Sequence, residues 1–198
     1  TRRNNMANAS TTGFGFRPVK KVGQNIDNAG LSEYNIAASS ALISHSAMVQ
    51  LTADGVILSS GNTDTNNLGV LNGVFFTDAT TSKPTFANFL AASNTATDII
   101  GFVNDDPMQM YEVMSADTAF NANEVGHCAD QVFANGSSPL FISRSKISAT
   151  TANTQAQLFI LGVSRDPDHS DTAAEGFALR VQIREHILVG NNTQRAGI

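Results

Sequence analysis

Short apolar runs, broken at close spacing by Gly, Asn, Asp and Pro, make up most of the chain after Gly30. The last run is the clearest, because Phe177, Leu179, Val181 and Ile183 alternate with polar residues in a period of two. That period places apolar side chains on one face of a strand and polar side chains on the other. The residues expected on the solvent-facing side are Arg180, Gln182, Arg184 and His186. The pattern predicts an all-β domain, a single β-sandwich or barrel of jelly-roll type.

Eight further runs are expected to be strands. They span residues 34–38, 47–52, 56–59, 68–76, 99–103, 110–114, 141–147 and 157–163. Residues 158–161 are apolar on both faces, which predicts a central strand covered on each side. At most one or two short helices are expected, and residues 83–92 are the alternative helix, since Phe86, Phe89 and Leu90 fall on one stripe.

Two Asn-Gly pairs mark places where the chain tolerates positive φ. Asn72-Gly73 interrupts an apolar run, so it is either a tight turn or a bulge within one long strand. Asn135-Gly136 stands in a more polar stretch and favours a turn.

Residues 1–30 have a composition of their own. Five of the chain's 12 Lys and Arg residues lie there, while Asp27 is the only one of its 17 acidic residues found in this segment. The five cations are Arg2, Arg3, Arg17, Lys20 and Lys21. A basic segment therefore precedes an acidic body. Residues 11–18 alternate glycines with bulky rings, so neither a helical nor a buried-strand period can be written for them.

This segment is expected to lack the contacts that would order it by itself. Fixing one backbone residue costs about 1–2 kcal/mol, while burying Phe14 or Phe16 returns about 1.5–3 kcal/mol. We therefore expect residues 1–30 to form an extended N-terminal arm that docks on another molecule, ahead of a β domain at 31–198. Its rings would fill apolar seams, its cations would meet acidic residues, and its glycines would permit close backbone approach. The expected contact residues are Gly13, Phe14, Gly15, Phe16, Arg17, Pro18, Lys20 and Lys21.

Composition narrows the function classes. Charged residues make up only 15% of the chain, which disfavours a helical bundle and a surface protected against association. Cys128 is the only cysteine, so an intrachain disulfide and a thiolate-rich metal site are excluded, and it is expected to be a small core residue. The pI near 5.2 disfavours nucleic acid as a partner. No apolar run has the length of a membrane span or signal peptide, so a soluble protein made inside the cell is expected.

Three clusters invite a chemical interpretation. Residues 166–171 place three carboxylates and His169 in six positions, which suggests a hard-cation loop, but an Asp-Pro turn that caps its own backbone is favoured. Asp105 and Asp106 resemble a glycosidase pair, yet neighbours on an extended chain point to opposite faces, so a strand-ending turn is favoured. The same geometry opposes a nucleophile and base at His127 and Cys128. No cofactor or metal site is therefore predicted.

Several phrases together resemble the small capsid-decorating, or cement, proteins of tailed phages. They lie at residues 7–15, 73–76, 102–107, 125–130, 162–168 and 185–186. The resemblance implies a non-enzymatic β-rich homotrimer on the outer surface of the virion head, at three-fold and local three-fold positions, that clamps the major capsid protein. It implies no nucleic-acid, membrane or small-molecule partner. An Asn often follows the Asp-Pro-Asp phrase in this family, whereas here His169 does. The arm could bind the capsid shell or sister subunits.

Two other functions stay open. A carbohydrate-binding β domain on a virion or cell surface would use loops such as 62–67, although the chain has no Trp and only Tyr34 and Tyr111 for stacking on sugars. A hydrolase built around Asp166, Asp168 or His169 is the third interpretation. Both rank below the capsid role.

Overall fold

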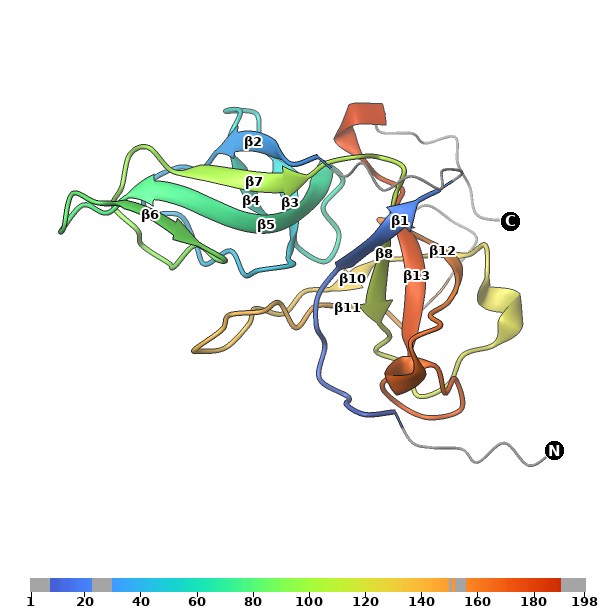
Figure 1. Ribbon diagram of the computed structural model, residues 1–198. Coiled ribbons are helices and arrows are strands. Elements are labelled where there is room, and N and C mark those ends of the chain that lie inside the picture. Colours follow the sequence, from blue (N-terminus) through green and yellow to red (C-terminus); the bar gives the residue numbers. More distant parts are fainter. Residues whose placement is uncertain (1–7, 23–29, 150, 152–155, 190–198) are drawn as a thin grey trace.

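The computed structural model describes residues 8–22, 30–149, 151 and 156–189, and these fold almost entirely into β-structure (Figure 1). The helices within them are three single 3-10 turns, against the one or two short helices expected. The helical turns are η1 Ala122–Glu124, η2 Pro167–His169 and η3 Ile187–Val189. The strands are β1 Arg17–Lys21, β2 Ser32–Asn35, β3 Met48–Leu51, β4 Ile57–Ser59, β5 Asn67–Thr77, β6 Pro84–Ala87, β7 Ile100–Asn104, β8 Gln109–Met114, β9 Cys128–Ala129, β10 Gln131–Val132, β11 Lys146–Ile147, β12 Leu158–Val163 and β13 Ala178–Ile183.

The strands form two main antiparallel sheets and one small one. A five-stranded sheet has the order β1-β8-β13-β12-β9, and a six-stranded sheet has the order β2-β7-β5-β3-β4 with β6 paired to β5. Strands β10 and β11 pair separately. Figure 1 shows the six-stranded sheet at the left and the five-stranded sheet at the right. No helix among the described residues is long and apolar enough to cross a membrane.

Each main sheet has its own apolar cluster. The cluster of the five-stranded sheet contains Phe16, Tyr111, Leu158 and Val181, and the six-stranded sheet adds Met48 and Val70 to it. The second cluster lies within the six-stranded sheet. Antiparallel sheets that pack through such apolar faces are consistent with a β-sandwich. The predicted all-β class is confirmed.

Strand β5 settles two of the open alternatives. It runs without a break for 11 residues, and its register with β7 shifts between Leu71 and Gly73. Asn72-Gly73 is therefore a bulge and not a turn. The alternative helix at 83–92 is wrong, because Pro84–Ala87 is strand β6 and pairs with the far end of β5.

Strand β13 confirms one face of the prediction and corrects the other. Its apolar side chains Leu179 and Val181 lie in the core, as the period of two predicts. The opposite face was expected to be exposed to solvent, but after Arg180 its side chains Gln182, Arg184 and His186 are all buried. Residues that follow or flank the strand cover this face: Gln182 donates to the Pro107 carbonyl at 2.7 Å, and the Leu188 amide donates to His186 at 3.2 Å.

Two other strand predictions need correction. Strand β12 is internal, between β13 and β9, but Phe159 and Leu161 are only half-buried, so the strand is not fully covered on both faces. The strand expected at 141–147 shrinks to β11. The reason is that Phe141 has a φ of 46° and that the segment after it bonds to a loop, with the Ser143 amide on the His45 carbonyl at 2.8 Å.

A buried amide joins the two main sheets. Gln157, which has no exposed surface, donates to the carbonyls of Gly61 and Asp64 at 2.9 and 2.8 Å, in the loop between β4 and β5. Its own carbonyl accepts from the Gln131 amide at 3.0 Å. Gln131 in turn donates to the Ser60 carbonyl at 2.7 Å. The loop before β5 is thus held by Gln157, which directly precedes β12 of the five-stranded sheet, and by Gln131 of the separately paired strand β10.

His186 gives the fold a pH dependence. Its imidazole is 1% exposed, and burial lowers its pKa below the usual 6.5 although Asp105 and Asp106 act in the opposite direction. The unfolded chain therefore binds more protons than the folded one just below the ordinary histidine pKa, so stability is present above that pH and falls as the pH is lowered through it. We expect the free energy of unfolding to drop between about pH 7.5 and about pH 5.5.

Urea unfolding at the two pH values measures this drop. His186→Gln should reduce it. An equal drop in the parent protein and in His186→Gln would contradict the assignment.

Candidate functional site

The N-terminal segment is part of the five-stranded sheet. Strand β1 pairs antiparallel with β8, and the Phe16 ring has no exposed surface. Phe16 meets the edge of Tyr111, with ring centroids 6.3 Å apart. The predicted arm without contacts to its own chain is therefore wrong for residues 8–22. The remainder of the predicted arm, residues 1–7 and 23–29, lies outside the described residues.

The start of the described segment is held by the loop after β12. The Asn8 side chain donates to the carbonyls of Asp171 and Glu175 at 2.9 Å each, and it accepts from the Asp171 amide at 3.1 Å. The Ala9 amide donates to the Asp168 carbonyl at 2.9 Å. These bonds span the length of the chain, which explains why local patterns in residues 7–15 did not predict them.

The cations of this segment face acids of the same chain. Lys21 forms an ion pair with Asp106 at 2.6 Å, which lowers the pKa of that carboxyl group. Arg17 lies 3.6 Å from Asp166, with its guanidinium 3.9 Å from the centroid of the Phe14 ring. Contacts to another molecule stay a prediction for the exposed members of the expected set, which are Arg17, Pro18 and Lys20.

The two glycines of the segment permit close approach, as predicted, but to the chain's own backbone. Gly15 has a φ of +70°, and a Cβ there would lie 2.4 Å from the Ser46 carbonyl oxygen. A Cβ on Gly13 would lie 2.2 Å from the carbonyl oxygen of Arg144. Both contacts fix the segment against loops that sequence spacing did not connect with it.

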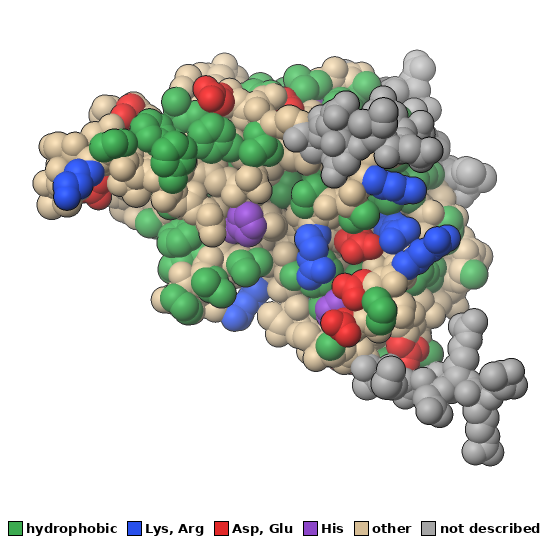
Figure 2. Space-filling view, in the orientation of Figure 1, with side chains coloured by type: hydrophobic (Ala, Val, Ile, Leu, Met, Phe, Trp, Pro, Cys, Tyr) green, Lys and Arg blue, Asp and Glu red, His purple; other side chains and the backbone are tan. Residues whose placement is uncertain are grey.

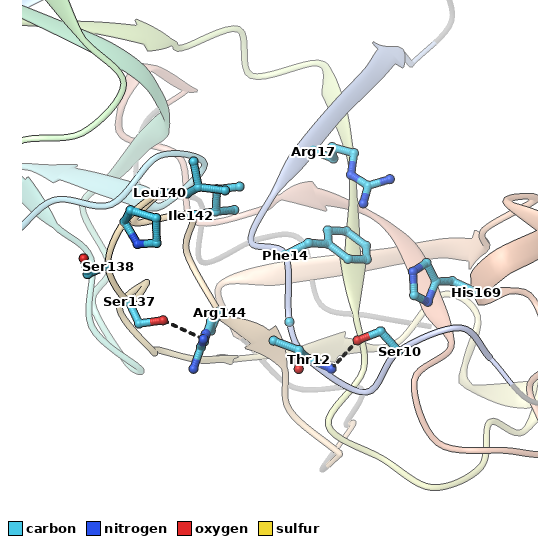
Figure 3. Close-up of a pocket in the computed structure, with 12 residues that line it drawn as sticks. Ser10, Thr12, Phe14, Arg17, Ser137, Ser138, Leu140, Ile142, Arg144 and His169 are labelled. Carbon is cyan, nitrogen blue, oxygen red and sulfur yellow. Dashed lines mark hydrogen bonds between the residues drawn. The ribbon is translucent and has the colours of Figure 1, made fainter.

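A groove of about 470 Å³ lies between this segment and the loop at 137–144 (Figure 3). In Figure 3, Phe14 and Arg17 come from one wall and Leu140 and Ile142 from the other, and Arg144 lies beside Ser137 on that second side. Leu140 is 66% exposed. The described lining residues are Ser10, Thr12, Gly13, Phe14, Arg17, Ser137, Ser138, Pro139, Leu140, Ile142, Arg144 and His169.

A second surface is the aromatic face, which we define as Phe75, Phe86 and Phe102 on the outer side of the six-stranded sheet. Their neighbours Val74 and Val103 point into the core, so these rings point outward. Phe75 and Phe86 have centroids 4.7 Å apart, and Phe86 and Phe102 stack at 6.2 Å. Phe86 is 74% exposed. Figure 2 shows hydrophobic side chains gathered over this sheet.

The turn interpretation of residues 166–171 is confirmed. Asp166 precedes helix η2 and accepts from the Asp168 amide at 3.1 Å. His169 is buried, bonds through Nδ1 to the Gly176 carbonyl at 2.8 Å, and lies beside Phe14 with ring centroids 5.4 Å apart. This histidine therefore joins the loop and the N-terminal segment. The described residues contain no group of three His, Cys, Asp or Glu side chains arranged to hold a metal ion.

The two carboxylates of the Asp105-Asp106 pair bind different partners, as predicted. Asp105 accepts from Ser32 and from the Tyr34 hydroxyl at 2.9 and 2.7 Å, and burial, together with the bond to Asp105, raises the pKa of Tyr34 to about 12. Asp106 instead accepts from the Met108 amide at 2.7 Å and pairs with Lys21. Cys128 is a buried residue of β9, as expected of a core thiol.

Polar side chains of the loop proposed for sugar binding form hydrogen bonds within the chain or are buried. Asn62 accepts from the Phe133 amide at 2.7 Å, Asp64 accepts from Gln50 at 2.8 Å, and Asn67 is buried. Polar side chains that are bonded within the chain are not free to exchange bonds with a sugar. This arrangement weighs against the carbohydrate-binding alternative.

Comparisons of the chain with protein-family models, with curated proteins and with solved structures found no match. The function is therefore inferred from the two surfaces described above and from the phrases that resemble capsid-decorating proteins.

Sequence reasoning missed both surfaces. The aromatic face could be predicted only from the pairing of β6 with β5. Phe75 and Phe76 are adjacent in the sequence, which does not show which of the two rings faces outward. The signal that could have found it is the excess of phenylalanine, with 12 Phe against no Trp and two Tyr. The groove could be predicted only from the contact between Gly13 and Arg144, which lie far apart in the sequence.

Proposed function

We propose that the chain is a structural protein that decorates and cements the head of a tailed phage. It binds the outside of the shell of major capsid protein, as a homotrimer at three-fold and local three-fold positions. The docking surface is the aromatic face. This differs from the free arm expected from the sequence, because Gly13, Gly15 and Phe16 are buried within the chain.

The observation that carries the proposal is a cluster of three neighbouring rings, with Phe86 exposed and Phe75 and Phe102 half-buried, on a sheet that already has a filled core on its other side. Soluble monomers rarely expose large contiguous apolar patches, and such patches mark contacts with other proteins. Aromatic side chains are enriched in interface cores, where each buries a large area. Phe86 is the most exposed large hydrophobic side chain among the described residues.

The phrases that resemble capsid-decorating proteins support the same function. Residues 73–76 belong to β5, residues 102–104 to β7, and residues 162–168 run from β12 into η2. They build the strands and turns that hold the aromatic face and the N-terminal segment, and two of the three rings lie within them. A role based on shape, without catalysis, agrees with this placement.

A shell of repeating subunits allows stable binding even when each aromatic face binds weakly. A trimer would present three copies of the aromatic face, so that the second and third contacts become intramolecular. Such linkage raises avidity by about 10²–10⁴ without new contacts. One patch per subunit could then hold firmly.

Co-sedimentation tests the proposal. Purified full-length chain is mixed with empty heads of the phage whose genome encodes it, and the bound fraction is measured against concentration. We expect saturable binding at a fixed number of copies per head. Absence of binding, or binding without saturation, would overturn the proposal.

Phe86→Ser is expected to weaken head binding about 30-fold, because a central ring in an interface contributes about 2 kcal/mol or more. Its own fold should be unaffected, since the side chain is largely exposed. The same co-sedimentation assay measures the change.

Val125→Ser is the matched control, because it also removes an exposed apolar side chain, from outside the aromatic face. It should bind as the parent does. Equal binding by the parent and Phe86→Ser would show that the aromatic face does not dock.

A further inference from the structure

The groove between residues 10–17 and 137–144 has one sign of charge. Its two ionised side chains are Arg17 and Arg144, and no acidic residue occurs among the described residues that line it. The chain as a whole carries a formal charge of −5, so a basic groove is a local departure. Clefts lined by one sign of charge attract ligands of the other.

Arg144 is the cation with the greater capacity for a new partner. Its guanidinium donates to the hydroxyl of Ser137 at 2.6 Å, which is a neutral group, and the residue is exposed. Arg17 shares its charge with Asp166 at 3.6 Å, so it contributes less. A guanidinium is well suited to pair with a carboxylate in two parallel hydrogen bonds.

Apolar side chains stand beside these cations. Leu140 and Ile142 are exposed on one wall, and Phe14 is half-buried on the other (Figure 3). Hydroxyl groups of Ser138 and Thr12 lie along the same opening. A ligand that matches this lining has a carboxylate next to an apolar group, and it also has polar groups that suit hydroxyl partners.

The walls are held in place before any ligand arrives. Gly13 packs directly on the backbone of Arg144, and the Phe141 ring lies 4.4 Å from that of Phe89, in the bend after β6, centroid to centroid. The His45 amide also donates to the Phe141 carbonyl at 3.0 Å. A rigid groove loses little entropy when it binds, which favours a short segment as the ligand.

We infer that this groove binds an extended peptide segment of a partner protein, one that carries an acidic side chain next to an apolar side chain. Peptide amides suit the hydroxyl groups of the walls better than a lipid chain does, and the acidic body disfavours a nucleic acid. The site is separate from the aromatic face and does not depend on the head-binding proposal.

Selection from a displayed library of random heptapeptides on the immobilised full-length chain tests the inference. We expect enrichment of peptides that carry Asp or Glu within two residues of Leu, Ile, Phe or Met. One enriched peptide is then synthesised, and its affinity is measured by fluorescence polarisation. Absence of that enrichment would overturn the inference.

Variants locate the binding. Arg144→Gln and Leu140→Ser should each weaken the synthetic peptide at least about fivefold, as expected for the loss of a charged or apolar contact. Lys20→Gln, which removes an exposed cation outside the groove, should change the affinity less than about twofold. Unchanged binding in both groove variants, with circular dichroism showing an intact fold, would overturn the assignment. Self-association that the two groove variants abolish would assign the groove to a second copy of the chain and overturn it equally.

Discussion

Phe16→Ala is expected to lower the free energy of unfolding by about 3–5 kcal/mol, the usual cost of removing a fully buried ring. The ring has no exposed surface and packs in the core of the five-stranded sheet against Tyr111. Loss of the ring leaves a cavity between β1 and the rest of that core. Chemical denaturation followed by circular dichroism measures the change.

Phe14→Ala is the control from the same segment. Its ring is half-buried and contacts His169 and the Arg17 guanidinium, so the expected loss is about 1 kcal/mol. If Phe16→Ala cost as little as Phe14→Ala, the N-terminal segment would be the loosely attached arm that its composition indicates.

Gln157→Ala is expected to cost about 2–4 kcal/mol, because it removes two hydrogen bonds worth about 0.5–1.5 kcal/mol each and leaves one buried amide without its partner at about 1–3 kcal/mol. The two bonds go to the carbonyls of Gly61 and Asp64, which keep Gln131 and Asn67 as donors, and the amide is the backbone N–H of Gln131. Because these bonds connect the two main sheets, the loss should appear in the cooperative unfolding transition of the whole protein. Differential scanning calorimetry measures it.

Gln182→Ala removes a buried amide of the same type that donates to the Pro107 carbonyl and, more weakly, to the Met108 sulfur at 3.6 Å. Its expected cost is about 1 kcal/mol. Equal costs for the two variants would mean that Gln157 does not join the sheets.

The sequence pattern predicted correctly those features that depend on neighbouring residues alone. The inward face of β13 follows from a period of two, because alternation alone decides which side chains share a face. The cap at Asp166 follows from the chemistry of one Asp-Pro turn. The bulge at Asn72-Gly73 was among the expected alternatives for the same reason.

Pattern failed where distant segments supply the stabilisation. The free energy of ordering the N-terminal segment was predicted from the burial of its own rings alone. The segment also gains hydrogen bonds to the edge of β8 and contacts with Asp171 and Asp106, which lie far along the chain. The polar face of β13 was expected to be wet because nothing near it in the sequence shows that the turn at 105–108 and helix η3 cover it. Long-range contacts of this kind leave no trace in a local period.

We propose that the aromatic face docks on a protein shell while β1 stays in its own sheet. Cryo-electron microscopy of phage heads decorated with the full-length chain tests this docking. We expect Phe75, Phe86 and Phe102 to lie against the major capsid protein and β1 to remain paired with β8. Density in which these rings face solvent, with residues 13–21 detached from β8 and laid on the shell, would contradict it.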